Sequence, residues 1–246
     1  MTLIVGLIAR DGIVMASESE ESTGYTAKRN VGKLWLETGE DWAVVIGGAG
    51  DAALIDNASR RISNALRGEV HLTHSSLQSV ADEVLGTVHS AYIDLDPQRP
   101  PLELVLGASC ADKLHLLCAT GRTTQFCDGF ACAGIGQDVA IYLLDRIDFR
   151  GADWRFGVVT AGFVLRQAKE SSRSCSGPSQ VCVLQAPPEP RWRWPGWEWV
   201  HDLDNDSHID IGELLTGYLK RSCSVPDLEE LESEDGYSDE RHPTPP

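Results

Sequence analysis

The stretch MTLIVGLIARDGIVMASES (residues 1–19) decides the fold, because it joins two apolar, β-rich runs through a tight turn. The runs Thr2–Ala9 and Ile13–Ser17 flank an Asp-Gly pair, and this arrangement predicts an antiparallel hairpin. Thr2 follows Met1 directly. It is therefore either the first residue of a strand or a nucleophile that becomes N-terminal when Met1 is removed.

The rest of the first 185 residues alternates between the two main periodicities. A second hairpin is expected over Lys33–Glu37 and Trp42–Gly47. Helical spacing then predicts two helices, the first with Ile55, Ala58, Ile62 and Ala65 on one face, the second with Leu77, Val80, Val84 and Val88 on one face. Three strands, two helices and a last strand follow, over Leu102–Ala108, Lys113–Ala119, Thr123–Cys127, Asp138–Ile147, Trp154–Lys169 and Gln180–Leu184. Two antiparallel sheets between helical layers satisfy this order, because both faces of each sheet are then buried.

Composition limits the partners and the compartment. The 246 residues include 21 Lys and Arg against 37 Asp and Glu, a formal net charge of −16. This charge argues against nucleic acid or an anionic membrane as partner and is compatible with binding a cation. The 7 cysteines form no CxxC motif, and most lie in apolar runs, which is typical of reduced thiols in a cytoplasmic protein. No apolar run is long enough to span a membrane, and no signal peptide is predicted.

Four segments are expected along the chain. Residues 1–185 form the main domain, and residues 186–200 are a linker rich in Pro and Trp. Residues 201–222 hold an acidic loop and a short helix. Residues 223–246 form an acidic tail that cannot bury enough apolar surface to become ordered, so it is predicted to be disordered.

The acidic loop DLDNDSHIDIGE (residues 202–213) has the spacing of a twelve-residue EF-hand calcium loop. Calcium prefers hard oxygen ligands, and a loop with this many carboxylates repels itself unless a cation is bound. The sharp turn of such loops is normally made by Gly, and here Ser207 stands in its place. The alternative interpretation is a solvated acidic loop. The predicted ligands are Asp202, Asp204, Asp206, the carbonyl of His208, Asp210 and Glu213.

Three stretches of the first half carry a resemblance to a known family. TLIVGLIARDGIVMASESEESTG (residues 2–24), GKLW (32–35) and VVIGGAGDAA (44–53) resemble the proteasome β-subunits and their bacterial relatives. The resemblance covers roughly Thr2 to Leu184. It implies an α+β fold, the four-layer αββα sandwich of the N-terminal nucleophile (Ntn) hydrolases, here with a short EF-hand-like appendage at the C-terminus. It also implies assembly into rings.

The same resemblance assigns roles to single residues. Thr2 would be the nucleophile, and its own α-amine would be the base once Met1 is removed. Lys33 would lie beside Thr2 and lower the pKa of that amine, and Glu18, where the family usually has Asp, would orient Lys33. The backbone N–H of Gly47 would stabilise the oxyanion. Substrate contacts are implied for Ser22, Val31, Val45 and Ala49.

Two positions in the second half depart from the family pattern. Ile135 stands where the family usually has a serine, and Arg173 stands where it has an aspartate.

The sequence thus predicts a threonine-type peptidase that needs no cofactor for catalysis and carries a calcium site. Its expected substrates are peptides or unfolded proteins, with self-association into rings and an unfoldase as a further partner. One alternative is a catalytically inactive structural ring subunit or a calcium-binding interaction protein. Another is an amidase for a small metabolite, which ring assembly disfavours.

Overall fold

The computed structural model describes residues 2–23, 27–93, 101–110, 113–147, 149, 151–172, 175–186 and 191–193. These residues all belong to one compact unit, Met1–Ser207. Within it the predicted α+β class is confirmed, since the described part of the chain combines antiparallel sheets with four helices.

The first sheet contains the hairpin that opens the chain. Its five strands are β10 (Phe130–Gly134), β1 (Leu3–Ala9), β2 (Gly12–Glu18), β11 (Ser179–Gln185) and β12 (Arg191–Arg193), in that spatial order. All neighbours pair antiparallel. The predicted hairpin is confirmed, but its register pairs Ala9 with Gly12. The turn is therefore Arg10-Asp11, one residue earlier than the predicted Asp-Gly pair, and Gly12 is the first residue of β2.

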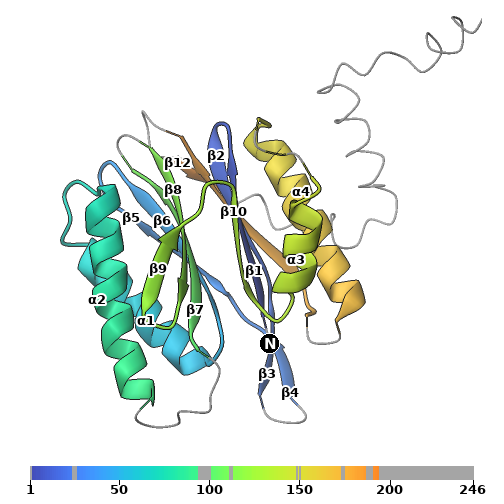
Figure 1. Cartoon of the computed structure of the whole chain (residues 1–246), viewed down its shortest axis with the longest axis horizontal. Helices are drawn as coiled ribbons and strands as arrows, with labels where there is room; N and C mark the ends of the chain where they lie inside the picture. Colours follow the sequence, from blue (N-terminus) through green and yellow to red (C-terminus); the bar gives the residue numbers. More distant parts are fainter. Residues whose placement is uncertain are drawn as a thin grey trace, which may run out of the picture. The chain divides into compact units, whose positions relative to one another are not determined.

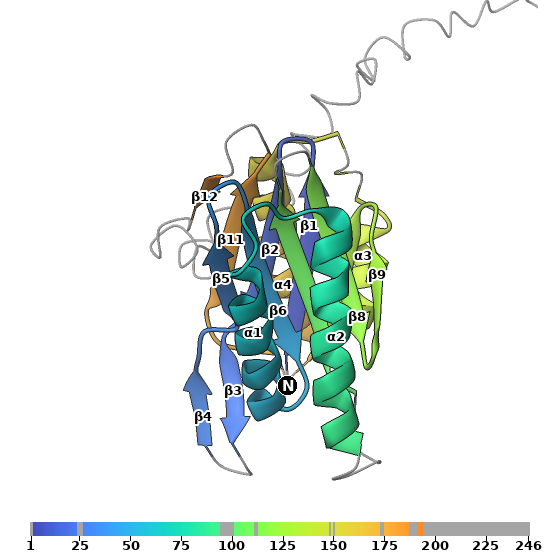
Figure 2. The ribbon, with the colours of Figure 1, turned by 90° about the vertical axis from the view of Figure 1, so that its left-hand side faces the viewer.

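The second sheet follows chain order. Its strands are β5 (Leu34–Thr38), β6 (Ala43–Ala49), β7 (Glu103–Ser109), β8 (Leu114–Thr120) and β9 (Thr123–Phe126). A separate two-stranded ribbon, β3 (Glu20–Thr23) with β4 (Ala27–Asn30), connects the two sheets in sequence. Figures 1 and 2 show that β3 and β4 project beyond the two sheets, next to the start of β1.

The two sheets face one another and each is covered by helices on its other face (Figure 1). The second sheet is covered by α1 (Ala52–Leu66) and α2 (His74–Ile93), which lie in front of it in Figure 2. The first sheet is covered by α3 (Gln137–Leu144) and α4 (Trp154–Ser171).

Strand β6 shows how the sequence divides its side chains between the two layers. Val44 and Ile46 point to α1 and α2, whereas Ala43, Val45 and Ala49 belong to the apolar cluster between the sheets. All five are buried. This alternation is the period of two that a strand buried on both faces requires.

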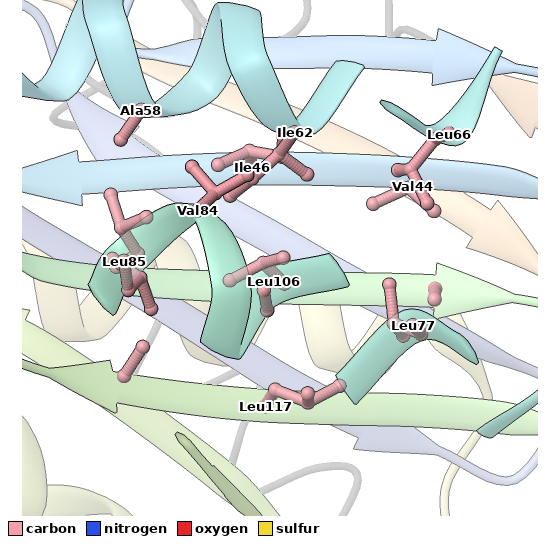
Figure 3. Close-up of a cluster of buried hydrophobic side chains, with 14 of the residues drawn as sticks. Val44, Ile46, Ala58, Ile62, Leu66, Leu77, Val84, Leu85, Leu106 and Leu117 are labelled. Carbon is pink, nitrogen blue, oxygen red and sulfur yellow. The ribbon is translucent and has the colours of Figure 1, made fainter. Parts of the chain in front are cut away.

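The layer between α1, α2 and the second sheet is the larger apolar cluster. Figure 3 shows Ile46, Leu106 and Leu117 of the sheet opposite side chains from both helices, among them Ile62 and Leu77. These five side chains are fully buried. Burial of branched side chains at native density is what holds the helices to the sheet.

Some elements differ from the sequence prediction. The ribbon β3–β4 and strand β10 were not predicted, because each is only four or five residues long and lacks a flanking signal of its own. In α1 the buried position of the last turn is Leu66 rather than Ala65, which is exposed. Among the described residues, no helix is long and apolar enough to cross a membrane.

Candidate active site

A buried lysine is the centre of the site. Lys33 precedes β5, and its side chain is about 7% exposed. Its Nζ donates to Thr2 Oγ1 at 3.2 Å, to Glu18 Oε1 at 2.6 Å and to the carbonyl of Glu20 at 2.6 Å. Segments from the start of β1, the end of β2 and the start of β3 therefore meet on one ammonium group.

Glu18 is the acid that compensates this lysine. Its side chain is fully buried at the end of β2. Besides the bond to Lys33, Oε1 accepts from the N–H of Leu3 at 3.1 Å and Oε2 from the N–H of Glu20 at 2.9 Å. Burial raises the pKa of Glu18 above its ordinary value, while Lys33 and the two backbone N–H groups act in the opposite direction.

Thr2 is held through its backbone as well as its hydroxyl. Its carbonyl accepts from the N–H of Ile135 at 2.9 Å. Gly134, just before, has φ +96°, and a side chain there would collide with the Thr2 carbonyl. The N–H of Gly134 donates to Glu103 Oε2 at 2.7 Å. The turn after β10 thus fixes where Thr2 lies.

The two glycines of β6 have different surroundings. Gly47 pairs with Leu34 and Val105, and a Cβ on it would come within 2.6 Å of Ile4, so this close approach of the two sheets requires glycine. Gly48 lines the cavity beside Thr2.

That cavity has a volume of about 440 Å³ and opens beside Thr2. It joins an apolar side, formed by residues such as Trp35 and Ile55, to a charged rim that includes Asp51. On this rim Glu21 and Arg29 form an ion pair of 2.7 Å. Its lining residues are Thr2, Glu21, Arg29, Val31, Gly32, Lys33, Trp35, Gly48, Gly50, Asp51, Ala52 and Ile55.

The residues predicted to contact substrate are only partly brought together. Val31 lines the cavity. Val45 and Ala49 instead lie in the apolar cluster between the sheets, because they occupy the face of β6 that points away from the cavity. Ser22 lies in β3, in register with Lys28.

Two further sets of predicted positions have different outcomes. Ile135 is about 54% exposed at the turn before α3. Arg173 lies outside the described residues. So do the six predicted calcium ligands, Asp202, Asp204, Asp206, His208, Asp210 and Glu213.

Three residues of the site were missed by sequence reasoning. Glu20 contributes its carbonyl to Lys33, Glu103 binds the backbone of Gly134, and the side chain of Gln180 accepts from the backbone N–H of Lys33 at 2.9 Å. The first contact uses the backbone carbonyl of Glu20, and because every residue type has this group, the sequence cannot reveal the contact. Gln180 did leave a signal, since it is a polar residue on the face of β11 that otherwise carries the apolar Cys182 and Leu184.

Comparison with known proteins places the fold among solved structures. No family model matches the chain, and no curated protein matches it. Anbu (ancestral beta-subunit) from Yersinia bercovieri superposes with a TM-score of 0.68 at 13% identity, over 91% of this chain and 98% of that chain. The helical assembly of the Anbu complex from Pseudomonas aeruginosa gives a TM-score of 0.65 at 15% identity, over 99% of this chain and 98% of the other. Anbu from Hyphomicrobium sp. strain MC1 superposes with a TM-score of 0.63 at 15% identity, over 91% of this chain and 97% of that chain. At these identities the likeness shows the fold alone.

These matches correct the family suggested by the sequence. The expectation of a proteasome β-subunit with an EF-hand appendage is wrong, since the solved structures that this chain resembles are Anbu proteins. None of the three is described as an EF-hand protein.

Proposed function

We propose that this chain is a threonine-type hydrolase of the proteasome-like kind, acting on peptide bonds through Thr2 within a four-layer αββα Ntn-hydrolase sandwich. The observation that carries the proposal is the contact of Lys33 Nζ with Thr2 Oγ1 at 3.2 Å, made by a lysine that is buried against Glu18. A hydroxyl next to a buried cation and a cavity is typical of an activated nucleophile.

The proposed chemistry begins after the bond between Met1 and Thr2 is cleaved. The freed α-amine takes the proton of Oγ1 while Oγ1 attacks the carbonyl carbon of the substrate. The C–N bond then breaks, and the amine passes the proton to the leaving nitrogen. The acyl ester left on Thr2 is hydrolysed by water, which returns the hydroxyl. Lys33 keeps the α-amine neutral and favours the oxyanion by its positive charge.

Gly47 remains our proposal for the oxyanion donor, with its backbone N–H as the donating group. Gly47 is the register partner of Leu34, the residue after Lys33, so it belongs to the end of β6 nearest the site.

The substrate side chain is proposed to enter the cavity. Val31, Trp35 and Ile55 supply apolar surface for a side chain of moderate size. Asp51 adds negative charge to its rim, where the charges of Glu21 and Arg29 compensate one another. An extended peptide with an aliphatic stem and a basic end, such as lysine or arginine, is complementary to both features.

Assembly is part of the proposal. The Pseudomonas aeruginosa Anbu complex forms a helical assembly, and this chain superposes on 98% of one of its chains. We therefore propose that this chain also self-associates and that unfolded proteins reach the site within the assembly, with an unfoldase as a further partner.

The test is hydrolysis of a fluorogenic peptide library by wild type, Thr2→Ser and Thr2→Val. Serine and valine are small residues like threonine, so removal of Met1 is matched in all three proteins. We expect Thr2→Ser to retain activity and Thr2→Val, which has the same shape but no hydroxyl, to lose it. Equal activity in wild type and Thr2→Val would refute the proposal. A structural subunit would show no hydrolysis in any of the three.

A separate proposal concerns calcium. The carboxylates of Asp202, Asp204, Asp206, Asp210 and Glu213, with the carbonyl of His208, have the number and type of oxygen ligands that calcium takes. Titration calorimetry of the full chain with calcium tests this, with Asp202→Asn/Asp206→Asn as the matched variant. Equal heats for the two proteins would exclude the site.

A further inference from the structure

We infer that Gln180 is a positioning residue, a side-chain clamp that fixes the segment Val31–Lys33 and thereby the ammonium of Lys33 beside Thr2. This inference rests on the proposed function for its catalytic consequence. Its structural part, the clamp itself, stands on hydrogen bonds alone.

The clamp consists of two hydrogen bonds to the backbone of one short segment. The Oε1 of Gln180 accepts from the N–H of Lys33 at 2.9 Å, and its Nε2 donates to the carbonyl of Val31 at 2.8 Å. Ser17 Oγ donates to the same Oε1 at 3.4 Å. Both halves of the amide are therefore used, so its orientation is fixed.

The clamped segment lies between two strands. β4 ends at Asn30 and β5 begins at Leu34, so residues 31–33 lie in neither strand. In a parallel ladder, one residue binds the C=O of one residue in the neighbouring strand and the N–H two positions further on, and the Gln180 amide binds these same two groups of the segment. The side chain thus takes the place of one residue of a neighbouring strand.

The position of Gln180 in its strand explains how it reaches this segment. Gln180 lies in β11, in register with Ser17 of β2. Cys182 and Leu184, two and four residues further along, belong to the buried cluster between the sheets. The period of two places Gln180 on that same inner face, at the end where the segment of Lys33 passes. A polar residue on a face that is otherwise apolar has a specific task, because its groups need partners there.

The clamp controls two parts of the site at once. Lys33 carries the ammonium that contacts Thr2, and Val31 lines the cavity. Because displacements of about 1 Å at a reacting centre cost up to about 100-fold in rate, an unclamped segment should slow the reaction strongly. The fold should survive, since β11 keeps its seven residue pairs with β2.

The experiment compares Gln180→Met, Gln180→Glu and Gln185→Met. Methionine has the length of glutamine but no amide. Glutamate keeps an acceptor for the Lys33 N–H and loses the donor to Val31. Gln185 is the matched control, because it is the same residue type at the other end of β11, where it pairs with Gly12. Two readouts are used: backbone hydrogen exchange of residues 31–33, and the rate at which Thr2 reacts with a peptide epoxyketone across a range of pH.

For Gln180→Met we expect about tenfold faster exchange at the Lys33 amide and a labelling rate lower by about tenfold or more. The acid limb of its pH–rate curve should move to higher pH, because a displaced Lys33 no longer lowers the pKa of the Thr2 amine. Gln180→Glu should protect the Lys33 amide better than Gln180→Met. Gln185→Met should match wild type in both readouts.

Exchange and labelling of Gln180→Met within twofold of Gln185→Met would overturn the inference. If wild type itself is not labelled, the proposed function fails, and the exchange rate of the Lys33 amide alone then decides whether Gln180 clamps the segment.

Discussion

At the scale of single residues, the site is a buried ion pair with a hydroxyl attached to it. Lys33 and Glu18 are joined at 2.6 Å, and each has further partners in the backbone. Taking two charges out of water is costly, and such a pair is retained only where the geometry satisfies both groups. The contact of Lys33 with Thr2 fits our proposal that this ion pair serves catalysis as well as stability.

Replacement of Lys33 should lower both the stability of the fold and the reactivity of Thr2. Lys33→Met leaves the carboxyl of Glu18 buried without its cation, which costs about 3–5 kcal/mol of unfolding free energy. Labelling of Thr2 should fall by about 100-fold or more. The matched control is Lys169→Met, which removes a lysine that donates to Ser179 Oγ at 2.8 Å within α4 and β11. Urea unfolding and epoxyketone labelling measure both effects, and loss of labelling in the control as well would contradict this prediction.

The carboxyl of Glu18 predicts a definite pH dependence of stability. Because burial raises its pKa in the folded state, the folded protein binds this proton more tightly than the unfolded chain does. Its contribution to stability is therefore full below the unfolded pKa of about 4.3 and is lost as pH rises through the folded pKa. The unfolding free energy of wild type minus that of Glu18→Gln should fall over this window. A difference that rises with pH, measured by urea unfolding at several pH values, would contradict the assigned direction.

At the scale of elements, the sequence predicted the strands and helices with a periodic apolar pattern. It missed the features that depend on contacts between distant residues. In the described part of the chain, the opening hairpin, the hairpin of β5 and β6, and the four helices each have an apolar period long enough to be recognised. The pairing of β10 with β1 joins residues more than a hundred positions apart, which no local pattern encodes. The same limit applies to the site. Thr2, Glu18 and Lys33 came from a family pattern, whereas the bonds of Gln180 and Glu103 exist only in the folded chain.

Two helix starts offer a matched test of the cavity. Asp51 caps α1 and Asp153 caps α4, and each side chain accepts from two backbone N–H groups. Replacement of either by alanine should cost about 1 kcal/mol of stability. Of these two capping residues, only Asp51 lines the cavity. Asp51→Ala alone should therefore raise KM for peptides with a basic side chain, by about fivefold for a contact worth ~1 kcal/mol. Equal KM values in the two variants would remove Asp51 from the binding site.

At the scale of the whole molecule, the two sheets bring distant segments of the described chain to one point. The site draws on β1, β2 and β3, on the start of β5 and on β11, while α1 supplies part of the cavity. The apolar layers on both faces of the second sheet hold this geometry in place. Three large apolar side chains at and just before α3 are exposed: Ile135, Ile141 and Tyr142.

Self-association should depend on this exposed surface. Exposed apolar side chains that lie close together mark interaction surfaces. In light scattering we expect a mass that is a multiple of the 26.8 kDa chain, and Tyr142→Glu should lower it. Val70→Glu is the matched control, since Val70 is also exposed but lies between α1 and α2. A monomer at all concentrations would contradict the assembly proposal, and equal masses for the two variants would exclude α3 as the interface.

The most direct test of the central claim is the intact mass of the purified protein before and after reaction with a peptide epoxyketone. This reagent needs a hydroxyl and a free α-amine on the same residue. We expect a chain without Met1 that gains one adduct, mapped to Thr2. A chain that retains Met1 and gains no adduct would contradict it, and the structural subunit would then be the better reading of this fold.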